Sequence, residues 1–261
     1  NVFVGQEAAV GNTTGSFNTA VGRTALYSNT TASNNTAVGY QAGYSNTTGT
    51  ANTFLGKEAG KPIVGGQQNT MLGMQAGNVG GTGVSYSTYV GEGTGYSSTG
   101  DYNTYIGHRA GVSMTSGQQN TILGRFNGND NGLDIRTSSN NIVLSDGAGN
   151  PRGFYNNAAV GWVFGDGDAS TYWPNTSSVN NHNGVMIFPA VGALGVTTNH
   201  GTALYLNRNS TSTPDGNLIS FYRNAVFKGS ISVSSSSTAY NTSSDHRLKE
   251  NVVYDWDATT R

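Results

Sequence analysis

The sequence predicts an all-β protein whose first half is a parallel β-solenoid built from short, regular turns. A pentad of the form Asn-Thr-Φ-Φ-Gly, in which Φ is an apolar residue, recurs along the first 124 of the 261 residues. Its closing glycines are Gly5, Gly22, Gly39, Gly56, Gly73, Gly91, Gly107 and Gly124, so the successive steps are 17, 17, 17, 17, 18, 16 and 17. The period of each solenoid turn is therefore 17. A fixed period of this kind is typical of solenoids, in which each unit stacks on the next.

The two apolar positions of each pentad point to opposite faces of a strand, because side chains alternate along it. The second position is always branched, and we expect it to face inward: Val4, Val21, Val38, Leu55, Leu72, Val90, Ile106 and Leu123. The first position varies from Ala to Tyr, which favours an outward or inter-subunit face: Phe3, Ala20, Ala37, Phe54, Met71, Tyr89, Tyr105 and Ile122. Three residues after each glycine comes a small residue, typical of a narrow coil: Ala8, Ala25, Ala42, Ala59, Ala76 and Ala110, with Thr94 as the exception.

Stacked turns repeat at about 4.8 Å, the spacing of paired strands. Asparagines at one place in successive turns are then expected to form a ladder, and the glycines permit bends with positive φ. We interpret the irregular step at Gly91 as a local bulge, because the following step cancels it.

A single coil of this kind is thin. One buried Val or Leu per turn returns much less free energy than ordering the backbone of the whole turn costs. We therefore expect several coils to associate, most simply as a homotrimer, with the variable Phe, Met and Tyr positions at or near the contact.

The rest of the chain predicts further β-structure. We place the solenoid at residues 1–150, with Asn141-Ile-Val-Leu-Ser145 as a degenerate last pentad. Residues 151–200 form an aromatic-rich distal β region, residues 201–243 an antiparallel β meander, and residues 244–261 a separate terminal segment. The first pentad begins at residue 1, which indicates a fragment of a longer protein.

Composition excludes several classes of function. The net charge is −1 and no run of Lys or Arg occurs, so binding to nucleic acid has no electrostatic basis. Cysteine is absent, which excludes disulfides and thiolate metal sites. No apolar run is long enough for membrane insertion.

Four aromatic residues of the distal region are candidates for receptor binding, because flat rings stack on the apolar faces of sugars. They are Tyr155, Trp162, Tyr172 and Trp173. The alternative is that they are buried and hold a trimer together.

Other candidates have simpler interpretations. The run from Asn127 to Gly132 has the spacing of a calcium loop but lacks its terminal Glu, which favours a turn. Asp166 and Asp168 could pair for glycoside hydrolysis, although Gly-rich loops often contain such pairs. Gly91, Gly93 and Gly95 resemble part of a dinucleotide-binding fingerprint, but they open no helix. The four histidines do not have the spacing of metal ligands. We predict no metal site and no cofactor.

The run from Ser244 to Val253, Ser-Asp-His-Arg-Leu-Lys-Glu-Asn-Val-Val, resembles the opening of the C-terminal intramolecular chaperone domain of phage tail fibres and tailspikes, including endosialidase tailspikes. Segments between 204 and 245 are similar to the region that leads into that domain. The NTAVGYQAG-type repeats are similar to those of phage fibre shafts and, more loosely, to the heads of trimeric bacterial adhesins.

In that family the chaperone trimerises the fibre and is released by self-cleavage at a serine, with a lysine as its base. The resemblance places these roles on Ser244 and Lys249, and a lysine with a lowered pKa can activate a serine. The alternative is that Ser244 caps a helix. The sequence ends at Arg261, soon after Ser244, so residues 244–261 are expected to be the start of a truncated chaperone.

The resemblance implies a structural and receptor-binding tail fibre located in the virion tail and produced in the host cytoplasm. Its partners would be sister chains, other tail proteins and a host surface glycan or outer-membrane receptor. We expect no enzyme activity beyond one self-cleavage. The alternatives are a tailspike enzyme that degrades surface polysaccharide, the head of a bacterial trimeric adhesin, and an ice-binding protein, which requires a flat outward Thr-x-Thr array.

Overall fold

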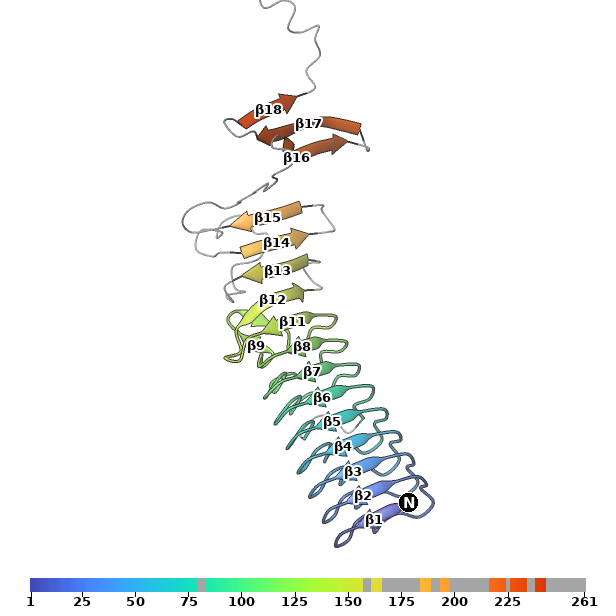
Figure 1. Ribbon diagram of the computed structural model, residues 1–261. Helices are drawn as coiled ribbons and strands as arrows, with labels where there is room; N and C mark the ends of the chain where they lie inside the picture. The colour runs from blue at the N-terminus through green and yellow to red at the C-terminus, as the bar shows by residue number, and fades with distance from the viewer. Residues whose placement is uncertain are drawn as a thin grey trace, which may run out of the picture. The chain divides into compact units, whose positions relative to one another are not determined.

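The computed structural model describes residues 1–78, 83–156, 161–165, 184–188, 193–197, 216–223, 226–233 and 238–242. Every helix or strand found in these residues is a β-strand (Figure 1). The chain divides into a unit of residues 1–203 and a unit of residues 204–261. The prediction of an all-β protein with a parallel solenoid is confirmed.

Eight short parallel strands, one per pentad, form the sheet of the solenoid (Figure 1). They are β1 (Val2–Val4), β2 (Thr19–Val21), β3 (Thr36–Val38), β4 (Thr53–Leu55), β5 (Thr70–Leu72), β6 (Thr88–Val90), β7 (Thr104–Ile106) and β8 (Thr121–Leu123). Equivalent residues pair in each step, as Thr19 with Thr36 and Val21 with Val38. The period of the sequence therefore sets the register in which the strands pair.

The same sheet continues beyond the regular repeat. The degenerate pentad forms β11 (Ile142–Ser145), which pairs parallel with β8. From there the pairing is antiparallel through β12 (Pro151–Asn156), β13 (Gly161–Gly165), β14 (Gly184–Phe188) and β15 (Ala193–Thr197). A hairpin of β9 (Asn129–Asp130) and β10 (Leu133–Asp134) lies between β8 and β11 in the chain.

The second unit contains a three-stranded antiparallel sheet. Its strands are β16 (Gly216–Arg223), β17 (Val226–Val233) and β18 (Thr238–Thr242), paired in that order. They lie within the segment in which the sequence predicts a meander.

The inward and outward rows of the strands are the reverse of the prediction. The first apolar position fills the interior: Ala20, Ala37, Phe54, Met71, Tyr89, Tyr105 and Ile122 are fully buried. The second position, predicted to be buried, is partly or largely exposed, with Leu55 42% and Leu72 39% exposed. The variable row can be buried because small residues elsewhere in the coil make room for its large side chains. Gly77 lies against Met71, for example, and Gly95 against Tyr89.

The predicted asparagine ladder is present and runs through the interior. The Oδ1 of one Asn accepts the backbone N–H of the next, as from Asn35 to Asn18 (2.9 Å) and from Asn52 to Asn35 (2.9 Å). In the sixth coil Ser87 takes the place of Asn, donating its backbone N–H to Asn69 and accepting from Asn103 through its hydroxyl. From Asn18 to Asn120, each Nδ2 of the ladder donates to a carbonyl of the following coil, such as that of Gly49. Asn141 extends the ladder from Asn120. These bonds satisfy polar groups that would otherwise be buried without partners.

A second, shorter ladder escaped the sequence analysis. Asn29 donates to Asn12 (2.6 Å), and Asn46 donates to Asn29 (3.2 Å). The ladder stops where Ile63 takes the next place, and Asn46 Oδ1 is left without a partner among the described residues. These three asparagines lie one full period apart in the sequence, a signal that could have revealed the ladder.

The turns use positive φ more widely than the glycines alone imply. The closing glycines from Gly5 to Gly107 have φ between 131° and 136°, and a Cβ on Gly39 would lie 2.5 Å from the carbonyl oxygen of Gly56. Non-glycine residues also adopt the left-handed region, before the strands as at Ala51 (φ 57°) and after them as at Gln75 (φ 58°).

The irregular step at Gly91 is not a bulge in the strands. β5 pairs with β6 and β6 with β7 without a break in register, as Thr70 pairs with Thr88 and Thr88 with Thr104. The first of these offsets is one longer than the regular period and the second is one shorter. The extra and the missing residue are therefore accommodated in the connections. The small residues after the glycines are buried as predicted, apart from the partly exposed Ala8 of the first turn.

Candidate functional site

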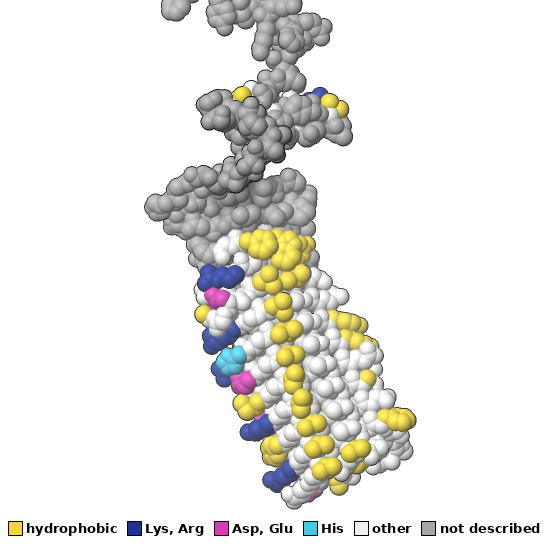
Figure 2. Space-filling model, viewed as in Figure 1, with side chains coloured by type: hydrophobic (Ala, Val, Ile, Leu, Met, Phe, Trp, Pro, Cys, Tyr) yellow, Lys and Arg dark blue, Asp and Glu magenta, His cyan; other side chains and the backbone are white. Residues whose placement is uncertain are grey.

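One face of the sheet carries two continuous rows of exposed side chains. A row of threonines, such as Thr36 and Thr53, runs beside the aliphatic row that includes Leu55, Leu72 and Ile106. An uninterrupted hydrophobic stripe along the solenoid is visible in Figure 2. No charged residue occurs in β1–β8. This strand face is therefore uncharged over the whole solenoid and carries one continuous aliphatic row beside the threonines.

Three aromatic side chains continue this face beyond the solenoid. The register places Tyr155 opposite Ile142 and Trp162 opposite Tyr155, in line with the threonine row. Phe164, 40% exposed, continues the aliphatic row through Gly153 and Leu144. Tyr155 and Trp162 lie 5.8 Å apart at 57°, and Trp162 stacks on Phe164 at 5.6 Å and 2°. These three residues form an aromatic platform.

A glycine on the neighbouring strand makes room for one ring of the platform. A Cβ on Gly153 would lie 2.8 Å from the ring of Phe164 and 3.8 Å from Leu144. Glycine at this position thus lets the ring lie flat on the sheet beside the aliphatic row.

The structure brings together two of the predicted receptor-binding residues, Tyr155 and Trp162. The other two, Tyr172 and Trp173, lie outside the described residues. Phe164 was missed, although it follows Trp162 by two positions and so shares its face. Ser244, Lys249, Asp166 and Asp168 also lie outside the described residues.

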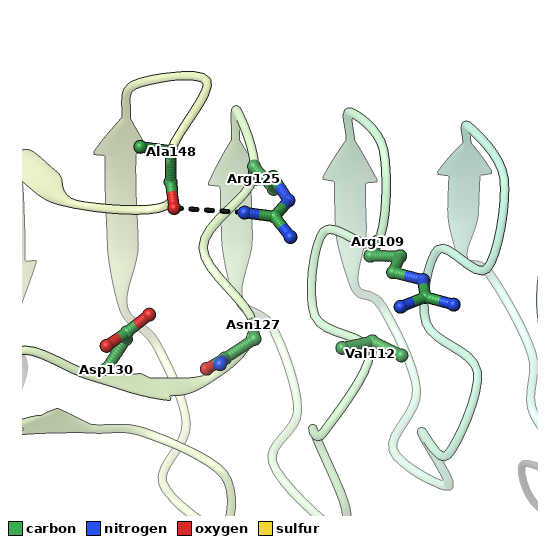
Figure 3. Close-up of a pocket in the computed structure, with 6 residues that line it drawn as sticks. All are labelled: Arg109, Val112, Arg125, Asn127, Asp130 and Ala148. Atoms are coloured by element: carbon green, nitrogen blue, oxygen red, sulfur yellow. Dashed lines mark hydrogen bonds between the residues drawn. The ribbon is translucent and has the colours of Figure 1, made fainter.

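A second surface lies along one edge of the solenoid, where charged side chains gather on the coils that follow the strands (Figure 2). Two adjoining hollows occur there, and they share Arg109 and Val112. The first has a volume of about 190 Å³ and is lined by Arg109, Val112, Arg125, Asn127, Asp130 and Ala148 (Figure 3). The second has a volume of about 290 Å³ and is lined by Gln75, Glu92, Gly93, Tyr96, Arg109 and Val112. We call the two together the edge groove.

Ion pairs and hydrogen bonds organise the edge. Glu92 accepts from His108 Nε2 (2.9 Å) and lies 3.5 Å from Arg109 Nε. Arg125 Nη1 donates to the carbonyl of Ala148 at 3.2 Å. In the two coils that precede Glu92, Gln75 donates a hydrogen bond to Glu58 (2.9 Å), and this bond lowers the pKa of Glu58. The edge therefore carries a network of ion pairs and hydrogen bonds between neighbouring coils.

The loop with calcium-like spacing is a hydrogen-bonded turn in the structure. Asn127 Oδ1 accepts the backbone N–H of Asn129 at 2.7 Å. Asp130 Oδ1 accepts the N–H of Asn131 at 2.9 Å. Within the described ranges, no three His, Asp, Glu or Cys side chains gather as a metal site.

No protein-family model, curated protein or solved structure matches this chain. In the part of the chain that the structure describes, no helix is suited to crossing a membrane.

The corrected facing changes one argument about function. Ice binding requires an outward Thr-x-Thr array, whereas the sequence predicts an outward row that contains Ala, Phe, Met and Tyr. The exposed pairs are instead Thr with Val, Leu or Ile. The repeated array is thus Thr-x-aliphatic, and it ends in the aromatic platform.

Proposed function

We propose that this chain is part of the shaft of a homotrimeric phage tail fibre that attaches the virion to a host cell surface. The proposal joins the resemblance of the repeats and of the Ser244 segment to one structural observation, the uncharged strand face. That face supports association of sister chains, because monomeric soluble proteins seldom expose a continuous apolar strip.

The corrected facing moves the proposed contact between chains. The contact is formed by the threonine and aliphatic rows, instead of the variable Phe, Met and Tyr row that fills the interior. The absence of charge from β1–β8 supports this assignment, since the centres of stable interfaces are depleted of charged residues. Each chain would bury the stripe against its sisters and expose its charged edge.

The aromatic platform belongs to the same face. Tyr155, Trp162 and Phe164 lie in line with the two rows, so in a trimer they pack between chains and stabilise it. This favours the second of the two sequence interpretations for Tyr155 and Trp162, in which buried aromatics hold the trimer together.

Light scattering on the purified chain tests the assembly. A trimer gives three times the chain mass of 27.1 kDa, and a monomeric mass at micromolar concentration would refute the proposal. An ice-recrystallisation assay on the same sample separates the ice-binding alternative, which requires the strand face to be free.

Self-cleavage requires a longer form of the gene that includes the complete chaperone. Ser244→Ala and Lys249→Ala are each expected to abolish processing, because one removes the nucleophile and the other its base. Processing that continues in either variant would contradict the assigned role. Ser244→Thr is the matched control, because it retains a hydroxyl.

Incubation with bacterial surface polysaccharide separates the fibre from a tailspike enzyme. A fibre binds the polymer and leaves its length unchanged. Released oligosaccharides would show that the chain degrades it.

A further inference from the structure

The larger hollow of the edge groove lies where a row of long side chains is interrupted by a glycine. The second residue after the closing glycine is a long polar side chain in several coils, such as Gln41, Glu58, Gln75 and Arg109, and two of these, Gln75 and Arg109, line the larger hollow. In the sixth coil this position is Gly93, with φ 61° like its equivalents. A Cβ there would meet only Arg109, 3.3 Å from its Cγ and 3.8 Å from its Nε. The gap at Gly93 forms the floor of the larger hollow.

The two walls of the groove differ in chemistry. Figure 3 shows Arg109, Arg125 and Ala148 along one side and Val112, Asn127 and Asp130 along the other. Tyr96 occupies the position in the sixth coil that Val112 occupies in the seventh, and both line the larger hollow. One wall is therefore cationic, and the other combines an apolar surface with amide and carboxylate groups.

The guanidinium groups retain capacity for a ligand. The side chain of Arg109 is 56% exposed, and its Nε faces Glu92 at 3.5 Å. Arg125 uses one N–H for the carbonyl of Ala148, whereas a guanidinium has five donors in a fork that matches a carboxylate.

We infer that the edge groove binds an acidic saccharide, a sugar chain that carries carboxylate groups. Its carboxylate pairs with Arg109 and Arg125, its hydroxyls donate to Asp130 and Asn127, and the apolar faces of its rings lie on Val112 and Tyr96. This deepens the proposed fibre function by naming the site and class of the receptor, and it rests on that function only for its biological role.

The mixed charge of the walls favours this class of ligand over a polyanion. Asp130 and Glu92 line the same groove as the two arginines, so a ligand with dense negative charge is repelled. A saccharide with spaced carboxylates and many hydroxyls matches both walls. The two hollows together fall in the size range of ligand sites, about 300–1,000 Å³.

Calorimetry with the purified full chain tests the inference, using oligogalacturonate and oligosialic acid as probes. Their carboxyl-reduced counterparts are the neutral controls and inorganic phosphate is the simple anion. We expect an acidic probe to bind and its reduced form to bind at least about tenfold more weakly, since a charge-assisted hydrogen bond contributes this much. Equal binding of the acidic and reduced forms, no binding of either acidic probe at millimolar concentration, or equally strong binding of phosphate would overturn the inference.

Three variants locate the site. Arg125→Ala and Gly93→Gln are each expected to weaken binding at least about tenfold, the first by removing a donor and the second by filling the floor with the residue found at 41 and 75. Arg23→Ala is the matched control, because Arg23 also follows a closing glycine but lies outside the groove. Unchanged affinity in Arg125→Ala, or an equal loss in Arg23→Ala, would refute the assignment.

Thermal unfolding of each variant separates loss of the site from loss of the fold. The fibre proposal fails separately, through a monomeric mass in light scattering, whatever the calorimetry gives. A trimer that binds none of the acidic probes leaves the fibre proposal standing and removes the groove.

Discussion

Gly95 lies directly against the ring of Tyr89 in the interior of the sixth coil. A Cβ on Gly95 would be 2.7 Å from Tyr89 Cε2, closer than carbon atoms approach without a shift. Gly111 has the same relation to Tyr105, again at 2.7 Å. In the second coil the pattern is reversed, because Ala20 fills the strand position and Leu26 the position of the glycine, and both are fully buried. Large and small residues thus exchange places within a coil.

This exchange gives a first prediction. Gly95→Leu alone is expected to destabilise the chain by at least about 1–3 kcal/mol through overpacking, and Tyr89→Ala by about 3–5 kcal/mol through a cavity. The double variant recreates the pair found in the second coil, so its loss should be smaller than the sum of the two. Urea unfolding of the four proteins measures the coupling, and additivity within about 0.5 kcal/mol would contradict the compensation.

The same exchange explains which part of the fold the sequence could predict. The period, the strands and the asparagine ladder follow from spacing alone. Spacing alone does not show which row of side chains faces the interior, because alternation divides the residues into two sets without identifying the buried one. The branched row suggested an interior and the variable row an exterior. The signal that could have decided it was the glycine six residues after most of the large residues, as Gly60 follows Phe54 and Gly95 follows Tyr89.

The candidate sites show a similar limit. Alternation could have added Phe164 to Tyr155 and Trp162, since all three share one face through register. The edge groove could not be predicted, because it depends on Gly93 interrupting a row that only the coiled backbone brings into line.

The strand face gives a second prediction. Leu72→Glu places a charge on the exposed aliphatic row and is expected to give folded monomers, since burying an unpaired carboxylate between chains is costly. Met74→Glu is the matched control, because Met74 is 45% exposed two residues away and outside the strand. Light scattering gives the mass and circular dichroism the fold. A trimeric Leu72→Glu variant would place the contact elsewhere.

The buried tyrosines predict sensitivity to alkali. Burial raises the pKa of Tyr89 and of Tyr105 above the ordinary value of 10.0. Above about pH 10 the unfolded chain therefore releases protons that the folded chain retains, so stability is constant below that pH and falls above it. Each such group contributes a slope of up to about 1.4 kcal/mol per pH unit.

Tyr89→Phe tests the assignment of the alkaline loss. The hydroxyl of Tyr89 has no hydrogen-bond partner of normal geometry among the described residues, so the change should cost little at pH 7 and should reduce the loss of stability between pH 10 and 11. Tyr40→Phe, at a 40% exposed site, is the control and should leave the slope unchanged. An equal slope in the wild type and Tyr89→Phe would show that other groups cause the loss.

Ala51 provides the last prediction, which concerns the backbone conformation that the coils share. Its φ of 57° lies in the left-handed region, and its side chain is exposed. A Cβ in that region costs roughly 1–2 kcal/mol, whereas the greater freedom of glycine in the unfolded chain costs about 0.4–1 kcal/mol. Ala51→Gly should therefore stabilise the chain by up to about 1 kcal/mol. Ala37→Gly is the contrasting control, because Ala37 is a buried strand residue and glycine there weakens the strand. The two changes should shift the midpoint of thermal unfolding in opposite directions, and a loss of stability in Ala51→Gly would show that the left-handed turn carries no relievable strain.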